Sequence, residues 1–276
     1  MTLFHRIIDR LLVFILRDVA SYRFSVISRN LKASFKYSSD TMLKRDIEGN
    51  YRFLAKIIRQ TCIQPTPKMM SKRMTINHLE DIDQWFSEGK SIVVTMGHVG
   101  NWEWAGVYLG LRYPGRVCAL YKRIKSPIVH NWMMRRRKFM PGYLVEAGKM
   151  NELLRLMKQQ PVMVLLIADQ NPGNDQGMIW TDFLGQKTAF ASGPETLAMK
   201  YNLPVLYLHN SPRVDGGYEL HLEILTSAPA LLQTGEITSL YARALEKNII
   251  QHRHAWLWSH KRWKRNPVNS PAANGN

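Results

Sequence analysis

Residues Ser91 to Trp104 read Ser-Ile-Val-Val-Thr-Met-Gly-His-Val-Gly-Asn-Trp-Glu-Trp, an apolar run followed by a polar turn and an aromatic segment. The apolar run over 92–95 predicts a buried strand. Gly97, Gly100 and Asn101 favour a turn after it, because glycine and asparagine tolerate the positive φ values that a tight corner often needs. A strand, a turn and a helix in this order form the basic unit of α/β folds.

His98 and Glu103 lie five residues apart in this segment. On one ideal helix, that spacing separates two side chains by roughly 140°. The pair therefore converges only if His98 lies in the turn and Glu103 in the first helical turn, aimed back at His98. An imidazole beside a carboxylate is a general base with a fixed tautomer. The alternative interpretation is a capped helix start, with Asn101 as the cap and His98 as a polar turn residue.

Runs of strand and helix character alternate along the rest of the chain. The strand-like runs cover residues 92–95, 116–121, 162–167, 204–209 and 218–225. The helix-like runs lie near 102–111, 127–139, 150–159, 193–201 and 236–253. This alternation predicts an α/β fold with a mixed, largely parallel sheet flanked by helices on both faces, and with a helical N-terminal preface. Sites in such folds gather at the carboxyl ends of strands, where His98, Asp169 and Gln170 lie.

Three segments are expected along the chain. Residues 1–64 form a basic amphipathic helical preface, residues 65–266 form the α/β domain, and residues 267–276 form a disordered tail rich in Asn, Pro, Ala and Ser. Apolar residues at helical spacing predict a helix over about 40–60 within the preface. The segment Pro65-Thr66-Pro67 ends that pattern and marks the first boundary.

The first seventeen residues predict an amphipathic helix. Its apolar side chains share one broad face: Leu3, Phe4, Ile7, Ile8, Leu11, Phe14 and Ile15. Arg6, Arg10 and Arg17 gather within about 40° on the flank of that face. Such a helix suits the headgroup layer of an anionic bilayer, although packing on the domain with the arginines in water is equally open. The chain has no uncharged apolar run of about 18 residues and no signal-peptide pattern, so we expect no transmembrane helix.

The net charge of +17 predicts an anionic partner: nucleic acid, a membrane surface, or an acidic carrier protein or cofactor. Residues 1–73 contain fifteen Lys and Arg against five Asp and Glu. A second cluster without acids lies between Tyr121 and Val145: Lys122, Arg123, Lys125, Arg135, Arg136, Arg137 and Lys138. A third cluster, at Lys261, Arg262, Lys264 and Arg265, is interleaved with Trp256, Trp258 and Trp263. Core packing and a membrane interface are both open for these tryptophans.

Several chemistries lack their sequence motifs. The chain has no glycine-rich phosphate loop, no zinc-type spacing of Cys and His, and no Gly-x-Ser-x-Gly elbow. Cys62 and Cys118 have no motif spacing and fit a reducing compartment. A base with a partner carboxylate but without a protein nucleophile suggests direct transfer to an acceptor that the base deprotonates.

The segment Ser192-Gly-Pro-Glu195 has the serine and glutamate spacing of a capping box, with proline in the first helical turn. It predicts the start of the helix near residue 193. The free backbone donors at such an end can bind an anion, but more often the end is only a well-capped helix.

The ordered motifs resemble those of the late acyltransferases of lipid A biosynthesis, the lauroyl/myristoyl transferase family. They are Thr-Met-Gly-His98-Val-Gly-Asn-Trp-Glu103, Tyr-Lys122-Arg-Ile-Lys-Ser-Pro, Ala-Asp169-Gln-Asn-Pro-Gly, Phe183-Leu-Gly-Gln-Lys, Ser192-Gly-Pro and Trp256-Leu-Trp-Ser-His-Lys-Arg-Trp263-Lys. The similarity covers roughly residues 20 to 267. Its ending is most similar to versions from Bacteroidetes-like bacteria.

The resemblance implies an enzyme on the cytoplasmic face of the bacterial inner membrane, peripherally attached. It implies acyl transfer from an acyl carrier protein or coenzyme A thioester to a hydroxyl of a lipid A precursor. In that reaction His98 is the general base and Glu103 its orienting and charge-stabilising partner. The residues expected to bind substrate are Asn101, Lys122, Arg123, Arg137, Asp169 and Gln170. The thioester is a co-substrate, and neither a cofactor nor a metal is expected.

The expected partners are therefore the thioester, an anionic glycolipid acceptor and an anionic membrane surface, whereas nucleic acid is not expected. Family members usually begin with a longer hydrophobic anchor than this short, charged preface. Either the membrane is met only peripherally, or the acceptor is another lipid, such as a lysophospholipid, glycolipid or aminolipid. A basic membrane-binding or nucleic-acid-binding protein without catalysis is the alternative from a different class.

Overall fold

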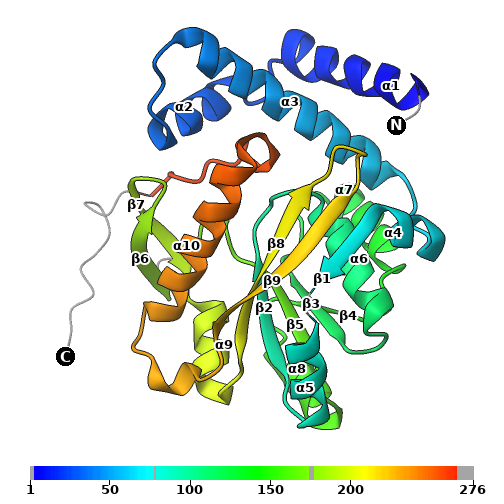
Figure 1. Ribbon diagram of the computed structural model, residues 1–276, viewed down its shortest axis with the longest axis vertical. Helices are drawn as coiled ribbons and strands as arrows, with labels where there is room; N and C mark the ends of the chain where they lie inside the picture. The colour runs from blue at the N-terminus through cyan, green and yellow to red at the C-terminus, as the bar shows by residue number, and fades with distance from the viewer. Residues whose placement is uncertain (1–2, 78, 174–176, 266–276) are drawn as a thin grey trace.

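A computed structural model describes residues 3–77, 79–173 and 177–265 (Figure 1). Its main sheet has the strand order β1-β9-β8-β2-β5-β3-β4. The strands are β1 (Met74–Asn77), β2 (Ile92–Met96), β3 (Val117–Tyr121), β4 (Tyr143–Glu146), β5 (Met163–Ile167), β8 (Val205–Pro212) and β9 (Tyr218–Thr226). All neighbouring pairs are parallel except β8 and β9, which form an antiparallel hairpin. The expected mixed, largely parallel sheet is confirmed.

Alternate residues of the central strands enter two separate cores. Ile92, Val94 and Met96 of β2 belong to one apolar cluster, whereas Val93 belongs to the other. This division follows from the period of two along a strand. Because both faces are covered, the strands read as continuous apolar runs, which is typical of parallel sheets.

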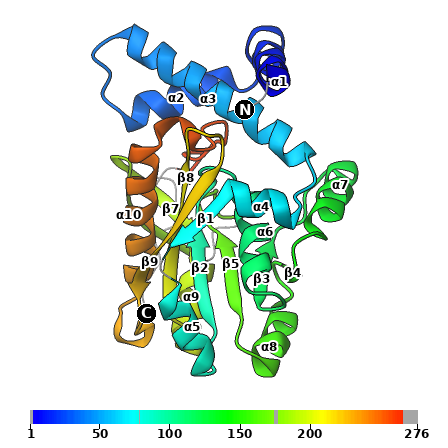
Figure 2. The same cartoon turned by 45° about the vertical axis from the view of Figure 1, so that its right-hand side comes forward.

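Helices cover both faces of the sheet (Figures 1 and 2). The first cluster includes side chains from α5 (Glu80–Ser87), α6 (Trp102–Arg112) and α10 (Glu236–Gln251). The second includes side chains from α8 (Met150–Gln159) and α9 (Gly193–Tyr201). The helix α7 (Pro127–Arg137), between β3 and β4, has no buried residue.

The N-terminal helices lie across one end of the sheet in both views. They are α1 (Leu3–Phe14), which continues as a π-helical turn to residue 19, α2 (Phe24–Ser34) and α3 (Asp40–Cys62). A short helix, α4 (Pro67–Arg73), leads into β1. The helix α3 ends where the Pro65-Thr66-Pro67 segment predicts, whereas the division into domains there stays a prediction. No helix in the described part of the chain is long and apolar enough to cross a membrane.

All five strands and the six helices that the sequence predicted from residue 40 onward are present. The sequence did not reveal β1, β4, α2, α4, α5 or the separate hairpin of β6 (Met178–Phe183) and β7 (Gln186–Ala191). The strands β1, β4 and β6 are short or only partly buried, so their apolar residues form no clear alternation. The helices α2 and α5 do place buried residues at helical spacing, and the prediction missed them. The expected tail over 267–276 lies outside the described residues.

The capping box expected at Ser192 and Glu195 is wrong. Ser192 makes no cap hydrogen bond through its side chain in the described structure. The buried Glu195 carboxylate instead accepts hydrogen bonds from Gly235 N (2.5 Å), Thr238 N (2.8 Å) and Thr238 Oγ1 (2.8 Å). It therefore caps the start of α10, which lies some forty residues further along the chain, rather than its own helix.

We predict that Glu195→Ala lowers the free energy of unfolding by about 2 kcal/mol, because buried donors lose a charged acceptor. Ser192→Ala, the matched control, changes the free energy of unfolding by only a few tenths of a kcal/mol. Urea unfolding followed by circular dichroism measures both. A cost at Ser192 near the ~1 kcal/mol typical of an N-cap would restore the capping-box interpretation.

Candidate active site

The site is formed where two adjacent parallel strands end. The strands β2 and β5 pair in register, with Met96 opposite Ile167. His98 and Asp169 each lie two residues beyond those partners, so the sheet brings them side by side across 71 positions of sequence. This is the carboxyl end of the parallel strands, where α/β folds place their sites.

Asp169 is fully buried, and three hydrogen bonds hold its carboxylate. Oδ1 lies 2.5 Å from His98 Nδ1. Oδ2 accepts from the backbone N of His98 at 2.7 Å and from Trp256 Nε1 at 2.7 Å. The carboxylate therefore has a single orientation, with one oxygen reserved for the imidazole.

Two glycines allow the turn to fit around this carboxylate. A Cβ atom at Gly97 would meet Leu245 and would lie 3.3 Å from Asp169 Oδ2. Gly100 has a φ of +62°, and a Cβ there would overlap Asn210. The turn after β2 thus needs glycine both for close approach and for its left-handed backbone.

The environment of Asp169 keeps it ionised. Burial raises its pKa most strongly, but the charge of His98 and the hydrogen bonds from His98 and Trp256 outweigh it and hold the pKa at about 2. An ionised carboxylate only accepts hydrogen bonds, so His98 Nδ1 carries the proton. His98 Nε2 is then the basic nitrogen.

The Nε2 side of His98 faces a polar and an aromatic neighbour. Gln170 Nε2 lies 3.3 Å from His98 Nε2, as the strand-end position of Gln170 predicts. The Trp102 ring meets the imidazole edge-on, with the ring centres 4.8 Å apart. The ring is thus held by packing on one side and by Asp169 on the other.

The predicted contact between Glu103 and His98 is wrong. The carboxylate on His98 is Asp169, and Glu103 instead forms a two-pronged ion pair with Arg137. Arg137 Nε and Nη2 lie 3.0 Å and 2.6 Å from the two Glu103 oxygens. Burial lowers the pKa of Arg137, but the Glu103 hydrogen bonds and charge raise it overall. Glu103 lies in the first turn of α6, as predicted, but serves a different partner.

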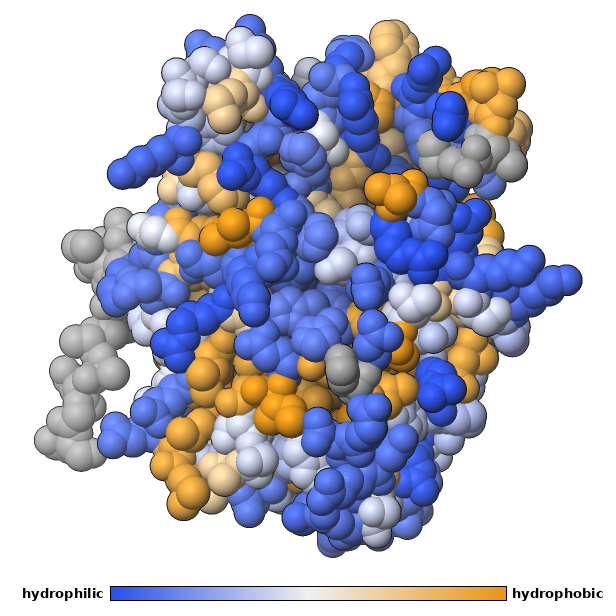
Figure 3. Space-filling model, viewed as in Figure 1, coloured by the Kyte–Doolittle hydropathy of each residue, from blue (hydrophilic) through white to orange (hydrophobic). Residues whose placement is uncertain are grey.

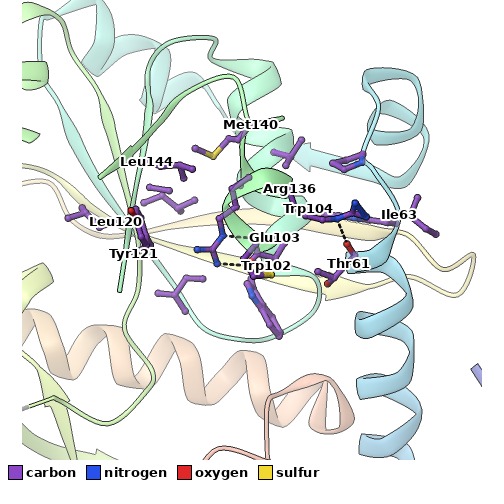
Figure 4. A pocket seen from close by; sticks show the side chains of 18 residues that line it. Thr61, Ile63, Trp102, Glu103, Trp104, Leu120, Tyr121, Arg136, Met140 and Leu144 are labelled. Atoms are coloured by element: carbon purple, nitrogen blue, oxygen red, sulfur yellow. Dashed lines mark hydrogen bonds and ion pairs between the residues drawn. The ribbon is translucent and has the colours of Figure 1, made fainter. Parts of the chain in front are cut away.

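Glu103 and Arg137 line an apolar pocket (Figure 4). Trp102 also lines this pocket, and its ring contacts His98, so a single side chain connects the pocket to the base. The remaining lining is mostly apolar: Ile63, Pro65, Trp104, Gly106, Val107, Ala119, Leu120, Met133, Met140, Leu144, Leu165 and Ile167. A pocket of this composition accepts a hydrocarbon group better than a polar one.

Three other predicted site residues have different surroundings. Asn101 is buried, and its Oδ1 caps α6 by accepting from Trp104 N at 3.0 Å, while Nδ2 donates to Gln60. It is therefore the cap of the alternative interpretation, and its expected role in binding substrate is corrected. Lys122 and Arg123 are exposed in the loop after β3, and their role stays a prediction.

The sequence missed Trp256 as a member of the site. Its tryptophan-rich segment indicated only core packing or a membrane interface, because no local pattern shows that the indole N–H reaches Asp169 across 87 positions. Further contacts join the segment that contains Trp256 to the turn after β2 and to the hairpin of β6 and β7: Gly100 N donates to Ala255 O, and Arg262 Nη2 donates to Ala189 O. Trp256 and Trp258 are both buried, so both are core residues.

Comparisons with known proteins give two matches, both to acyltransferases. Residues 2–265 match the family described as bacterial lipid A biosynthesis acyltransferase. A phosphatidylinositol mannoside acyltransferase from Mycolicibacterium smegmatis is 26% identical over 194 residues. That similarity covers 66% of this chain and 61% of the length of the relative.

Trp256 and Trp258 provide a matched pair for testing the Asp169 geometry. Both are buried, and each indole N–H donates one hydrogen bond of 2.7 Å, to the Asp169 carboxylate and to Arg253 O respectively. Because the folded-state pKa of Asp169 is depressed, its ionised form stabilises the fold above the ordinary value of 3.8, and this contribution is lost as the pH falls toward about 2.

We predict that Trp256→Phe raises the pKa of Asp169 and so moves acid unfolding to higher pH. Trp256→Phe and its control Trp258→Phe both lose stability, since a hydrogen bond to a charged group is worth about 1.5–3 kcal/mol and a neutral one about 1 kcal/mol. Only Trp256→Phe shifts the acid limb of stability against pH, measured by denaturant unfolding at a series of pH values. Equal acid limbs in the two variants would contradict the assigned role of Trp256.

Proposed function

Since the chain belongs to the bacterial lipid A biosynthesis acyltransferase family, we propose that it transfers a fatty acyl group from a thioester to a hydroxyl of a glycolipid. The observation that carries the proposal is a histidine with an ionised carboxylate on Nδ1, an Nε2 lone pair that faces the Gln170 amide, and an apolar pocket lined by the neighbouring Trp102. This arrangement suits a base that deprotonates a hydroxyl next to a bound hydrocarbon chain. No side-chain nucleophile is needed.

In the proposed reaction, His98 Nε2 takes the proton of the acceptor hydroxyl, and the oxygen attacks the thioester carbonyl carbon. Asp169 stabilises the imidazolium that forms and holds its orientation. The tetrahedral intermediate then collapses, the carbon–sulfur bond breaks, and the imidazolium returns the proton to the leaving thiolate. The products are an ester and a free thiol.

Arg137 is a cation of the pocket lining that is held in place by an acid. Arg137 Nε and Nη2 donate to the Glu103 carboxylate, which fixes the plane of the guanidinium group. The other N–H groups of Arg137 can then donate to a developing oxyanion or to a phosphate of either substrate. Glu103 is thus proposed as a positioning residue for Arg137 rather than the partner of the base.

A lipid A precursor is the first proposed acceptor, because the family is named for that product and the chain is strongly cationic. The phosphatidylinositol mannoside acyltransferase favours another anionic glycolipid as the second candidate. The donor is proposed to be an acyl carrier protein or coenzyme A thioester, both of which are anionic. Two assignments within the family stay predictions: that the enzyme is of the lauroyl/myristoyl transferase type, and that it is most similar to versions from Bacteroidetes-like bacteria.

Peripheral attachment to the cytoplasmic face of the bacterial inner membrane is part of the proposal. The helix α1 has no buried residue, and its apolar side chains Phe4, Ile7, Leu11 and Phe14 are exposed. These side chains gather over α1 at the upper right of Figure 3. Exposed apolar residues flanked by arginines suit an anionic bilayer.

Mass spectrometry of lipids from cells with and without the protein tests the function. We predict that one acylated glycolipid disappears without the protein and is restored by the wild type but not by His98→Ala. In an assay with that lipid, Asp169→Asn lowers kcat by about 10²–10⁴-fold, because the wrong tautomer is favoured. Glu103→Gln retains a hydrogen bond to Arg137 and loses less.

Equal lipid profiles with and without the protein would contradict the proposed transfer. A larger loss for Glu103→Gln than for Asp169→Asn would instead restore Glu103 as the partner of the base. Expression and thermal unfolding of each variant control for stability.

Gly106 gives a test of the apolar pocket. A Cβ atom there would lie 3.7 Å from Leu165 Cδ2 and from Met140 Sδ, so a small side chain fits but takes up pocket volume. We predict that Gly106→Val lowers kcat/KM for the longest accepted acyl chain at least tenfold and less for shorter ones, whereas Gly106→Ala changes the preference little. Transfer measured over a series of acyl lengths checks this, and an unchanged preference in the valine variant would exclude the pocket as the acyl site.

A further inference from the structure

The helix α7 carries an exposed stripe that the proposed reaction does not use. Ile128, Trp132 and Arg135 recur at helical spacing, so they share one side of the helix, and Phe139 follows just after its end. The exposed fractions of the three apolar residues are 83%, 41% and 44%. Large apolar side chains this exposed, interleaved with cations on a helix without a buried residue, indicate a contact with something outside the chain.

The opposite side of α7 belongs to the pocket. Met133 and Arg137 line it, and Arg137 is fixed there by Glu103. The helix is therefore a wall with the pocket on one side and the apolar stripe on the other. Whatever binds the stripe lies one helix diameter from the proposed acyl site.

Contacts with α3 place α7 near α1. Arg136 of α7 donates to the backbone carbonyls of Thr61 and Cys62, at the end of α3 (Figure 2). The helix α1 runs antiparallel to α3, because Asp9 pairs with Arg59 whereas Arg17 pairs with Glu48. The N-terminal end of α1, with Phe4 and Ile7 exposed, thus points toward the same end of α3.

The two exposed helices consequently flank one wall of the pocket. Thr61, in the last turn of α3, and Ile63 and Pro65, between α3 and α4, line that wall. A surface that contacts both α1 and α7 would extend across this part of the pocket rim.

Charge and shape favour a lipid bilayer as the occupant. The loop and helix over residues 122–138 contain seven cations and no acid. Arg137 pairs with Glu103 and Arg136 donates to carbonyls of α3, so the five other, exposed cations complement an anionic surface. Each basic residue near such a surface contributes roughly 1 kcal/mol. Ile128 and Trp132 project from a convex helix rather than lining a groove, as suits insertion among lipid headgroups, whereas protein partners bury their main contacts in packed pockets.

We propose that α7 is a second bilayer-contacting surface, which acts with α1 to hold the pocket rim against an anionic membrane. The benefit of this contact rests on the proposed function, because in acyl transfer a lipid acceptor would reach His98 without leaving the bilayer surface. The contact itself is independent of catalysis.

Flotation of the purified full-length chain with vesicles tests the contact. Two kinds of vesicle are compared, phosphatidylcholine alone and phosphatidylcholine with about one-third phosphatidylglycerol. The difference in affinity between them reports the electrostatic attraction, and binding to the neutral vesicles reports apolar insertion. Ile128→Ser/Trp132→Ser is expected to lower the affinity for the anionic vesicles at least tenfold, and Ile7→Ser/Leu11→Ser to do the same. The control Ile224→Ser/Leu231→Ser removes two apolar residues whose exposed fractions, 43% and 83%, are close to those of Trp132 and Ile128, and it is expected to bind like the wild type.

Tryptophan quenching by brominated lipids supplies a second measurement. The wild type is expected to lose more fluorescence than Trp132→Phe on anionic vesicles, because Trp132 inserts. Unchanged vesicle affinity in the Ile128/Trp132 variant, or equal quenching with and without Trp132, would overturn the proposal. Loss of binding to acyl carrier protein with vesicle affinity unchanged would assign the stripe to an acidic protein and would also overturn it.

The flotation result is separable from the proposed reaction. His98→Ala is expected to bind vesicles like the wild type, because His98 is 15% exposed and lies in the site rather than on α7. If lipid profiles show no acyl transfer but the α7 variants lose vesicle affinity, the function fails while the bilayer contact stands.

Discussion

The buried carboxylate of Asp169 is the constraint on which the rest of the site depends. Its oxygens hold the backbone and ring of His98 after β2 and the indole of Trp256 near the C-terminus. An ionised group in a dry interior is tolerated only when its hydrogen-bonding capacity is satisfied. Three donors from two distant segments do this, and they thereby fix the tautomer and orientation of the imidazole.

Much of the fold could be predicted because the strands of a parallel sheet, buried on both faces, are readable as apolar runs. The location of His98 was predictable for the same reason, since it directly follows such a run. Its partner was not, because local patterns do not give the order of strands in a sheet. The strand β5 is third among the predicted runs, yet it lies directly beside β2, and only that adjacency joins Asp169 to His98.

Glu103 shows how spacing alone misassigns a pair. Five residues separate it from His98, and a helix start does place it near the turn, but its carboxylate faces Arg137 on α7. The sequence gives no sign of that contact, because four neighbouring cations, Arg135 to Lys138, are equivalent until helix geometry selects one. The helix period turns Arg137 inward and leaves Arg135 on the exposed side.

Two carboxylates near one reaction thus have separate tasks. The partly buried Arg137 without Glu103 would carry an uncompensated charge, which is costly, and Glu103 without Arg137 would place a second negative charge beside the apolar pocket. Paired, they are locally neutral, so the electrostatics of the base depend mainly on Asp169. This separation lets α7 hold a cation at the pocket while its outer side stays free for an external surface, which connects the geometry of the site to the cationic character of the whole chain.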